Sequence, residues 1–394
     1  MLDKPRPSTA EIVRQCEDLF LDLTFTAARE WKAAEPGRIV VGFLPYYAPR
    51  ELVHAAGGLP LGVFGGGDNL EVIHGDAYYQ SYICRIPRST VELGVSGRLD
   101  FVDGMMFPSI CDVIRNLSGM WKLMFPKKGS RYIDLPHNFD DDLGGEFYIS
   151  ELRETCEWLS GMTGRPVTDD AIRASIAVFN DNRHLVGDLY KLRAEQPWNV
   201  PSSELYLLLR GGMVIPVEQH NQMLRDYMDA ARSQNRAKKD NSRVVVCGAF
   251  CEQPPLNLIK SIELSGCYIV DDDFILVTRW ENSDIDTDGD PLAALAKSYL
   301  HDSKSTPPKY EPDEAKKGLY LVDSVRQNRA EGVIFAMTSF CDPGLLERPI
   351  LQSVLKKHGI PQIAFKYAEN SGQMQPIREQ AGTFADSIKL WSGA

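Results

Sequence analysis

The chain has 394 residues, of which 43% are hydrophobic and 25% are charged, and its formal net charge at pH 7 is −11. This length predicts two or three domains, and the acidic balance argues against a nucleic-acid-binding protein, which needs a basic face. No apolar run reaches the ~18 residues of a membrane span, and the polar N-terminal segment lacks the apolar core of a signal peptide, so we expect a cytoplasmic protein with no membrane partner.

The first part of the chain alternates helices and strands. Apolar residues at helical spacing predict a helix from Thr9 to Trp31. Short apolar runs predict buried parallel strands at 38–47, 59–66, 100–109 and 130–137. Helices are predicted at 48–57 and directly after the third strand, beginning at Cys111. This alternation is typical of βαβ units.

The middle of the chain is helical, and the alternation then returns. Residues 147–239 show helical patterns and no convincing strand. Further strands are predicted at 242–252, 267–274, 330–342 and 361–369, with helices at 254–266 and 345–360. We therefore expect an α/β fold in which two parallel-sheet, Rossmann-like halves flank a helical segment. The expected division is 1–146 (N-terminal helix and first α/β domain), 147–240 (helical connector or lid) and 241–394 (second α/β domain).

Three cysteines lie where a cleft is expected. Cys111 and Cys341 each follow a predicted strand, in the similar segments FPSIC and MTSFC, and Cys84 lies in YICRIPRS before a helix. The similar segments suggest a duplicated unit. Ligands bind outside the carboxyl ends of parallel strands, and helix starts favour anionic sulfur. Spacing alone leaves two interpretations open, ligands of one iron–sulfur cluster or small buried thiols, because the separations match no local ferredoxin motif.

The other cysteines favour a structural interpretation. Cys247, Cys251 and Cys267 form a second group that could bind metal, but buried core thiols explain them better. Cys16 and Cys156 occupy apolar positions of predicted helices and are expected in the core.

Other sequence features argue against nucleotide or hydrolytic metal chemistry. The stretch GGLPLGVFGGGDN lacks the G-x-G-x-x-G spacing, and no G-x-x-x-x-G-K-[ST] occurs, so no nucleotide is expected on this chain. The aspartate runs at 140–142 and 271–273 are expected in solvated loops rather than at a metal. The seven histidines show no paired zinc spacing.

Several segments together carry a family resemblance. VGFLPYYAPRELVHAAGGLPLGVFGGG resembles the opening of the 2-hydroxyacyl-CoA dehydratase and benzoyl-CoA reductase family. YICRIPRSTVELGVSGRLDFVDGMMFPSICDVIRNL is similar to its first two cysteine boxes, and GVIFAMTSFCDPGLLERPIL to the third. GIPQIAFKYAENSGQMQPIREQAGTFAD resembles the closing strand and a basic, glycine-containing loop. Within the family, the sequence of these segments is most similar to that of the smaller, C-type catalytic subunit of the ATP-dependent reductases.

This resemblance implies a cofactor and several partners. Cys84, Cys111 and Cys341 match the three cysteines that hold a 4Fe–4S cluster, which can form part of a double cubane. The implied partners are a homologous sister catalytic subunit, separate ATPase activator subunits, ferredoxin and an acyl-CoA substrate. The implied reaction is the low-potential, two-electron reduction of benzoyl-CoA to a cyclohexadiene-carbonyl-CoA. The alternatives are a 2-hydroxyacyl-CoA dehydratase subunit, and an electron-transfer or scaffold subunit whose sister chain binds substrate.

Five further residues are site candidates. His54, His74 and Tyr82 lie near the family boxes and carry groups that can donate protons, although a structural role explains each of them better. Arg85 and Arg88 flank Cys84 and suit the thioester or phosphates of CoA, with a surface ion pair as the equally good alternative.

Overall fold

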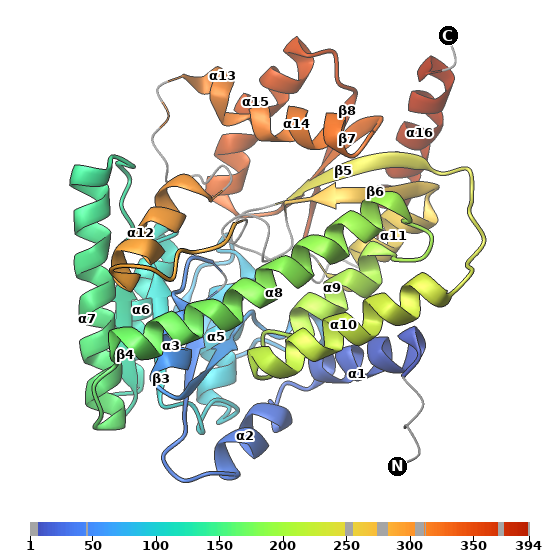
Figure 1. The fold of residues 1–394 in the computed structure, drawn as a ribbon. Coiled ribbons are helices and arrows are strands. Elements are labelled where there is room, and N and C mark those ends of the chain that lie inside the picture. Colours follow the sequence, from blue (N-terminus) through green and yellow to red (C-terminus); the bar gives the residue numbers. More distant parts are fainter. Residues whose placement is uncertain are drawn as a thin grey trace.

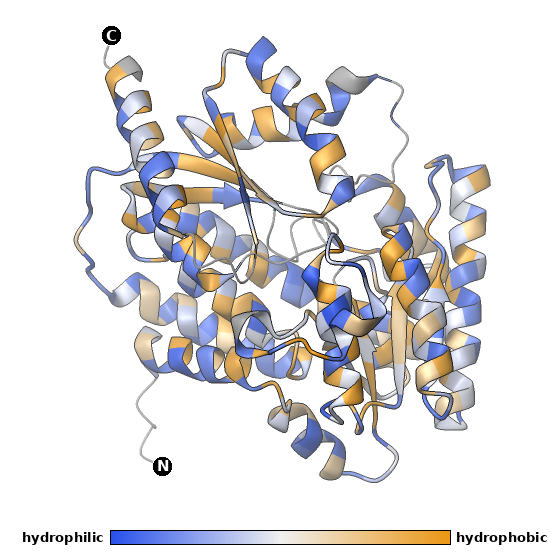
Figure 2. Ribbon diagram, turned by 180° about the vertical axis from the view of Figure 1, so that it is seen from behind, coloured by the Kyte–Doolittle hydropathy of each residue, from blue (hydrophilic) through white to orange (hydrophobic). Residues whose placement is uncertain are grey.

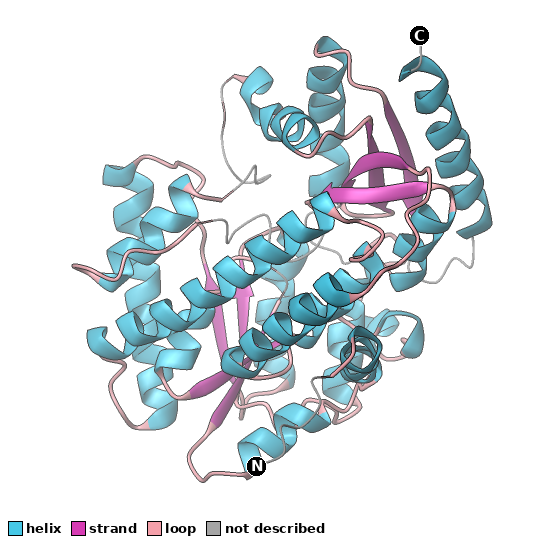
Figure 3. Cartoon of the chain, turned by 45° about the vertical axis from the view of Figure 1, so that its right-hand side comes forward, coloured by secondary structure: helices cyan, strands magenta, loops and turns pink. Residues whose placement is uncertain are grey.

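Two four-stranded parallel sheets form the framework of the protein. The computed structural model describes residues 7–44, 46–248, 255–273, 283–303, 311, 313–368 and 374–392. The first sheet contains β1 (Ile39–Phe43), β2 (Gly58–Gly62), β3 (Gly104–Pro108) and β4 (Gly129–Ile133), in the order β2-β1-β3-β4. The second contains β5 (Ser242–Gly248), β6 (Cys267–Asp272), β7 (Gly332–Thr338) and β8 (Gln362–Tyr367), in the order β6-β5-β7-β8. Both sheets therefore have the same strand order, and helices surround each of them (Figure 3).

The predicted α/β class is confirmed, and each predicted strand is present in a shorter form. The register places Val41 opposite Gly104 and Val333 opposite Gln362, with all pairs parallel. Where the expected strands extended beyond residues 248, 273 and 368, their ends lie outside the described residues. Because neighbouring strands are parallel, their carboxyl ends lie at one edge of each sheet.

The helix predicted from Thr9 to Trp31 is wrong in one respect, because it is two helices. They are α1 (Thr9–Leu21) and α2 (Thr26–Ala33). Asp22 interrupts them: its carboxylate accepts hydrogen bonds from the backbone N–H of Thr24 (2.8 Å) and of Thr26 (2.7 Å). A side chain that binds these N–H groups starts a new helix at the expense of continuing the old one.

Short helices follow the strands of the first half. They are α3 (Arg50–Ala55), the 3₁₀ turn η1 (Gly67–Asn69), α4 (Gly75–Tyr78), α5 (Arg85–Val95) and α6 (Asp112–Met124). A π-helical turn, η2 (Asp141–Gly145), leads into the helical middle of the chain.

The helical middle contains the longest helix, which connects the two halves. The helical middle consists of α7 (Glu146–Thr163), α8 (Asp169–Glu195), α9 (Ser202–Gly211) and α10 (Val217–Ser233), and α8 is the longest of them. In Figure 1, α8 runs from α3 in the first half to β6 in the second. The buried Arg183 on α8 pairs with Glu51 of α3, and the buried Arg193 pairs with Asp272 of β6. One helix is thus attached to α3 in the first half and to β6 in the second half through buried ion pairs.

The second half contains more helix than the sequence predicts. It comprises α11 (Leu256–Leu264), α12 (Pro291–His301), α13 (Glu314–Lys317), α14 (Leu319–Gln327), α15 (Asp342–Lys357) and α16 (Met374–Ser392). The expected basic, glycine-containing loop near the end of the chain is largely α16. Ile377, Ala381, Ala385 and Ile388 are buried at helical spacing along it, and this apolar stripe explains why the segment is helical.

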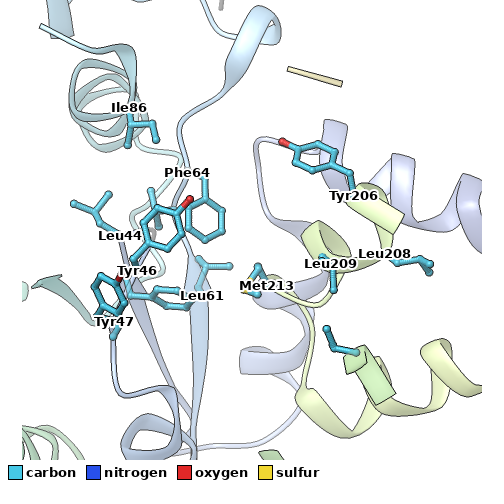
Figure 4. Close-up of a cluster of buried hydrophobic side chains, with 14 of the residues drawn as sticks. Leu44, Tyr46, Tyr47, Leu61, Phe64, Ile86, Tyr206, Leu208, Leu209 and Met213 are labelled. Atoms are coloured by element: carbon cyan, nitrogen blue, oxygen red, sulfur yellow. The ribbon is translucent and has the colours of Figure 1, made fainter. Parts of the chain in front are cut away.

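The hydrophobic core runs through both halves. The strands are apolar in Figure 2, whereas outer helix faces are hydrophilic. Figure 4 shows Tyr46, Tyr47 and Phe64, from the segments after β1 and β2, gathered near Met213, with Leu209 of α9 beyond it. Phe43 and Phe64 meet edge to face at 5.9 Å. Among the described residues, no helix is long and apolar enough to cross a membrane.

Candidate functional site

Each of the three candidate cysteines is the residue that immediately precedes a helix. Cys84 is the N-cap of α5, Cys111 of α6 and Cys341 of α15. Cys111 and Cys341 follow β3 and β7, which hold the same place in the two sheets. Cys84 and Cys341 are buried, and Cys111 is half-buried. At a helix start, the backbone N–H groups and the helix dipole favour a negatively charged sulfur.

A tyrosine places two of these thiols in one neighbourhood. Burial raises the pKa of Tyr79 well above its usual range, and the nearby Cys84 and Cys111 raise it further. The Tyr79 hydroxyl is buried, and no residue that the structure describes offers it a hydrogen bond. Cys84 and Cys111 therefore lie close enough to the same phenol to act on it electrostatically.

A cavity of about 420 Å³ is lined by Cys111 and by residues of the helix that follows Cys341. It lies where the carboxyl ends of the two sheets meet, with Cys111 on one side and the beginning of α15 on the other. Pro343, two residues after Cys341, contributes to its wall. The remaining lining residues are Ser109, Ile110, Asp112, Arg115, Tyr132, Asp134, His137, Lys317, Leu346, Glu347 and Ile350. The structure thus brings Cys111 and the helix that follows Cys341 to one cavity between the halves.

The cavity wall is rich in charge. Arg115 and Lys317 supply positive charge, and Asp112, Asp134 and Glu347 supply negative charge. Lys317 Nζ lies 3.7 Å from the largely buried Glu347 carboxylate. Such a wall can hold a polar or anionic group at the mouth of an otherwise apolar site.

Tyr132 adds a hydroxyl group to the same wall. Burial raises the pKa of Tyr132, and the neighbouring Asp134 carboxylate raises it further. The phenol therefore keeps its proton at neutral pH and can donate a hydrogen bond into the cavity.

Sequence analysis missed most of these lining residues. Arg115 carried a signal, because it lies one helical turn after Cys111 on the same helix. His137 follows a predicted strand end. Lys317 and Tyr79 carried no signal, because only the tertiary fold brings them to the cysteines.

The three expected proton donors lie elsewhere, and none of them lines the cavity. His54, in the last turn of α3, contacts Ser175 Oγ (2.9 Å) and Glu218 (3.0 Å) through its two ring nitrogens. His74 contacts Glu92 at 3.0 Å and is otherwise exposed, and the Tyr82 ring is 62% exposed.

The two expected CoA-binding arginines hold the segment before Cys84 in place. Arg85 donates to the backbone carbonyls of Gly67 (3.1 Å) and Leu70 (2.5 Å). Arg88 forms an ion pair with Asp76 at 2.8 Å. Both side chains attach residues 67–76 to α5, and neither lines the cavity.

The other described cysteines are core residues. Cys16, Cys156 and Cys267 are buried, and burial raises their pKa values to about 12, 11 and 11. Thiols with such pKa values stay protonated and are poor metal ligands. Cys247 is fully buried in β5, with its Sγ 3.3 Å from Asp273. Cys251 lies outside the described residues.

One of the two aspartate runs differs from expectation. Residues 140–142 are exposed, as predicted. The expectation of a solvated loop at 271–273 is wrong, because Asp272 and Asp273 are buried. Asp272 is the partner of Arg193, and Asp273 accepts from Tyr320 (2.5 Å) and from the N–H of Gly248 (2.8 Å). Asp272 and Asp273 are tolerated in the interior because each of them accepts hydrogen bonds there.

The chemistry of the three cysteines suits an iron–sulfur cluster, whose ligands are thiolates. Within the described ranges, no three His, Cys, Asp or Glu side chains converge on one point as ligands of one ion. A cluster carries its cysteines on different irons, so its ligands are spread more widely. The donors have the right chemistry: thiols at helix starts, with an unsatisfied hydroxyl beside two of them.

Comparison with known proteins agrees with this arrangement. The sequence profile of the 2-hydroxyglutaryl-CoA dehydratase D-component family matches residues 45–388. The C subunit of benzoyl-CoA reductase from Thauera aromatica is 64% identical, over 98% of this chain and 100% of the relative.

More distant relatives are dehydratase subunits. The β subunit of (R)-2-hydroxyglutaryl-CoA dehydratase from Acidaminococcus fermentans is 30% identical, over 89% of this chain and 93% of the relative. The β subunit of (R)-phenyllactyl-CoA dehydratase from Clostridium sporogenes is 26% identical, over 90% of this chain and 93% of the relative. The resemblance found in the sequence is therefore confirmed, and the chain is an enzyme subunit that belongs to the 2-hydroxyglutaryl-CoA dehydratase D-component family.

Proposed function

We propose that this chain is a catalytic subunit of a benzoyl-CoA reductase. The observation that carries the proposal is the 64% identity to the C subunit of a benzoyl-CoA reductase along nearly the whole of both chains. The reaction adds two electrons and two protons to the aromatic ring of benzoyl-CoA and yields a cyclohexadiene-carbonyl-CoA.

In this proposal, Cys84, Cys111 and Cys341 hold a cluster of the 4Fe–4S type. Their positions at three helix starts around one region support it, as does the protonated state expected for Cys16, Cys156 and Cys267. Three thiolates leave one iron with a position for another ligand or for a bridge to a second cubane. When bound, the cluster supplies single electrons at low potential.

The cavity beside Cys111 is the proposed place for the thioester end of the acyl-CoA. Arg115 and Lys317 can bind its carbonyl oxygen or a CoA phosphate. The Tyr132 hydroxyl and the His137 ring line the same wall and are candidates to hold or pass a proton. They replace His54, His74 and Tyr82 as the better-placed candidates. Arg85 and Arg88 could reach CoA only by giving up the partners that they hold here.

The proposed assembly supplies what this chain lacks. Its sequence has no P-loop, so the energy of ATP hydrolysis must come from separate ATPase activator subunits that receive electrons from ferredoxin. The other half of the catalytic pair is a homologous sister subunit. The relatives support a multi-subunit enzyme, since each is named as a subunit.

A 2-hydroxyacyl-CoA dehydratase subunit is the second candidate. The observation that favours it is the match to a dehydratase family over residues 45–388, with dehydratase β subunits at 26–30% identity. In that reaction the injected electron is recovered and the net change is loss of water. Incubation of the anaerobically purified complex with benzoyl-CoA, and separately with 2-hydroxyacyl-CoA thioesters, in the presence of ATP and a strong reductant distinguishes the two.

The cluster is tested by substitution of single cysteines in the complete complex. Iron and acid-labile sulfide are expected to fall strongly in Cys84→Ser, Cys111→Ser and Cys341→Ser. Cys156→Ser is the matched control, because this buried thiol lies in the core of α7. Full iron content in Cys111→Ser would contradict the ligand assignment. Acyl-CoA bound only to the sister chain would instead assign this chain an electron-transfer or scaffold role.

A further inference from the structure

The Tyr79 hydroxyl is a buried polar group that the described residues leave unsatisfied. No described residue accepts its hydrogen bond. Removing a hydroxyl from water without a partner costs about 1–3 kcal/mol, so such a group calls for an explanation. The ring lies against the hydrophobic core, whereas its neighbour Tyr78 is 50% exposed. The two neighbouring tyrosines therefore differ: Tyr78 reaches solvent, whereas the hydroxyl of Tyr79 is buried.

The segment that carries Tyr79 is fixed to the helix that begins at Cys84. Glu92 of α5 accepts hydrogen bonds from the N–H groups of Ile73 (2.9 Å), His74 (2.6 Å) and Gly75 (3.0 Å), at the start of α4. A Cβ atom at Gly75 would lie 2.1 Å from a backbone carbonyl oxygen of α5, so α4 sits directly on α5. Tyr79 directly follows α4 as its C-cap and is thereby held in a fixed position relative to Cys84.

We propose that Tyr79 donates a hydrogen bond to sulfur of the group that Cys84 and Cys111 hold. The inference rests on the proposed cluster and adds a specific protein donor to it. Both thiols lie near the phenol, and the bound group would bring the acceptor that the described protein atoms do not provide. A tyrosine phenol carries its proton at neutral pH, and the burial of the Tyr79 hydroxyl favours that neutral form, so it retains the hydrogen that it must donate.

A hydrogen bond to cluster sulfur stabilises the more negative, reduced state. It therefore raises the reduction potential. Tyr79 is accordingly a positioning residue that adjusts the potential of the cluster. Its removal is expected to make electron delivery to this cluster harder without removing a ligand.

The test uses the complete, anaerobically purified complex. Tyr79→Phe removes only the hydroxyl and should shift the cluster midpoint potential to a more negative value, measured by redox titration with EPR detection, with iron and sulfide unchanged. Replacement of Tyr79 by 3-fluorotyrosine keeps the hydroxyl and strengthens it as a donor, so it should shift the potential in the opposite direction. Tyr78→Phe is the matched control and should leave the potential unchanged.

The outcomes separate this inference from the proposed function. Wild-type complex without iron and sulfide would overturn the cluster itself. Full iron with an unchanged potential in Tyr79→Phe, or an equal shift in Tyr78→Phe, would overturn the role of Tyr79. If Tyr79→Phe loses its iron, the 3-fluorotyrosine protein decides: a positive shift supports the hydrogen bond, and no shift refutes it.

Discussion

Replacement of Arg193 by methionine should destabilise the protein strongly, because it leaves a buried carboxylate without its cation. Arg193 is fully buried on α8, and its guanidinium donates to Asp272 at 2.5 Å and to Ser202 Oγ at 3.1 Å. Asp271 lies 3.6 Å away on the same strand. Carboxylates next to this guanidinium raise the pKa of Arg193 against the opposing effect of burial. The charge is therefore fixed in the core.

The size of the effect follows from what remains after the substitution. Methionine fills much of the space, but Asp272 then has no opposite charge in a site that excludes water. Loss of one partner of a buried pair typically costs about 3–5 kcal/mol. A pair at the surface is worth about 0–1 kcal/mol, and the same helix contains one, between the exposed Asp170 and the half-buried Arg173 at 2.9 Å.

Urea unfolding, followed by circular dichroism, provides the measurement. Arg193→Met should lower the free energy of unfolding by about 3–5 kcal/mol, whereas the control Arg173→Met should change it by less than about 1 kcal/mol. Arg193→Met combined with Asp272→Leu removes both charges and should recover much of the loss. Equal midpoints for Arg193→Met and Arg173→Met would refute the claim that the buried pair holds α8 to the second sheet.

Three further predictions concern packing and protonation. Gly144→Ala should destabilise the protein by about 1–3 kcal/mol in the same urea assay, because a Cβ would lie 1.7 Å from the carbonyl oxygen of Asn138; Gly161→Ala, with open space around it, should instead stabilise α7 by about 0.5–1 kcal/mol. Burial lowers the pKa of His220 to about 3, so the unfolded chain binds the proton first and stability should fall by about 1.4 kcal/mol per pH unit below about pH 6.5; His220→Gln should lose this slope. Burial raises the pKa of Cys267 to about 11, so iodoacetamide at about pH 8 should alkylate it only after unfolding, as mass spectrometry can show.

The arrangement of strands and cysteines was predictable because its signals are local. Buried parallel strands are short apolar runs, and Cys111 and Cys341 follow two of them directly. The carboxyl ends of such strands share one edge of a sheet, so the position of both thiols followed from topology. The core positions of Cys16 and Cys156 followed in the same way from helical spacing.

The features that escaped prediction depend on contacts distant in sequence. The acids at 271–273 are buried because Arg193 and Tyr320 reach them from other helices. Tyr79 meets the cysteines only after α4 packs on α5. Lys317 reaches the cavity from a helix far from β3 along the chain. His54 and His74 were predicted as proton donors because they lie near the family segments in the sequence, and the sequence does not show which residues lie near the cysteines in space.

The two sheets are equivalent, yet they contribute different numbers of thiols, and the fold offers a reason. In the first half, Cys84 precedes the helix before the third strand, and Cys111 follows that strand. In the second half, Cys341 again follows the third strand, but the residue that precedes the helix before that strand is Gly318. A Cβ at Gly318 would lie 2.8 Å from that of Val354 on α15, so close packing of α14 on α15 leaves no room there for a fourth thiol. The two halves therefore match at Cys111 and Cys341, but differ where Cys84 stands in the first half and Gly318 in the second.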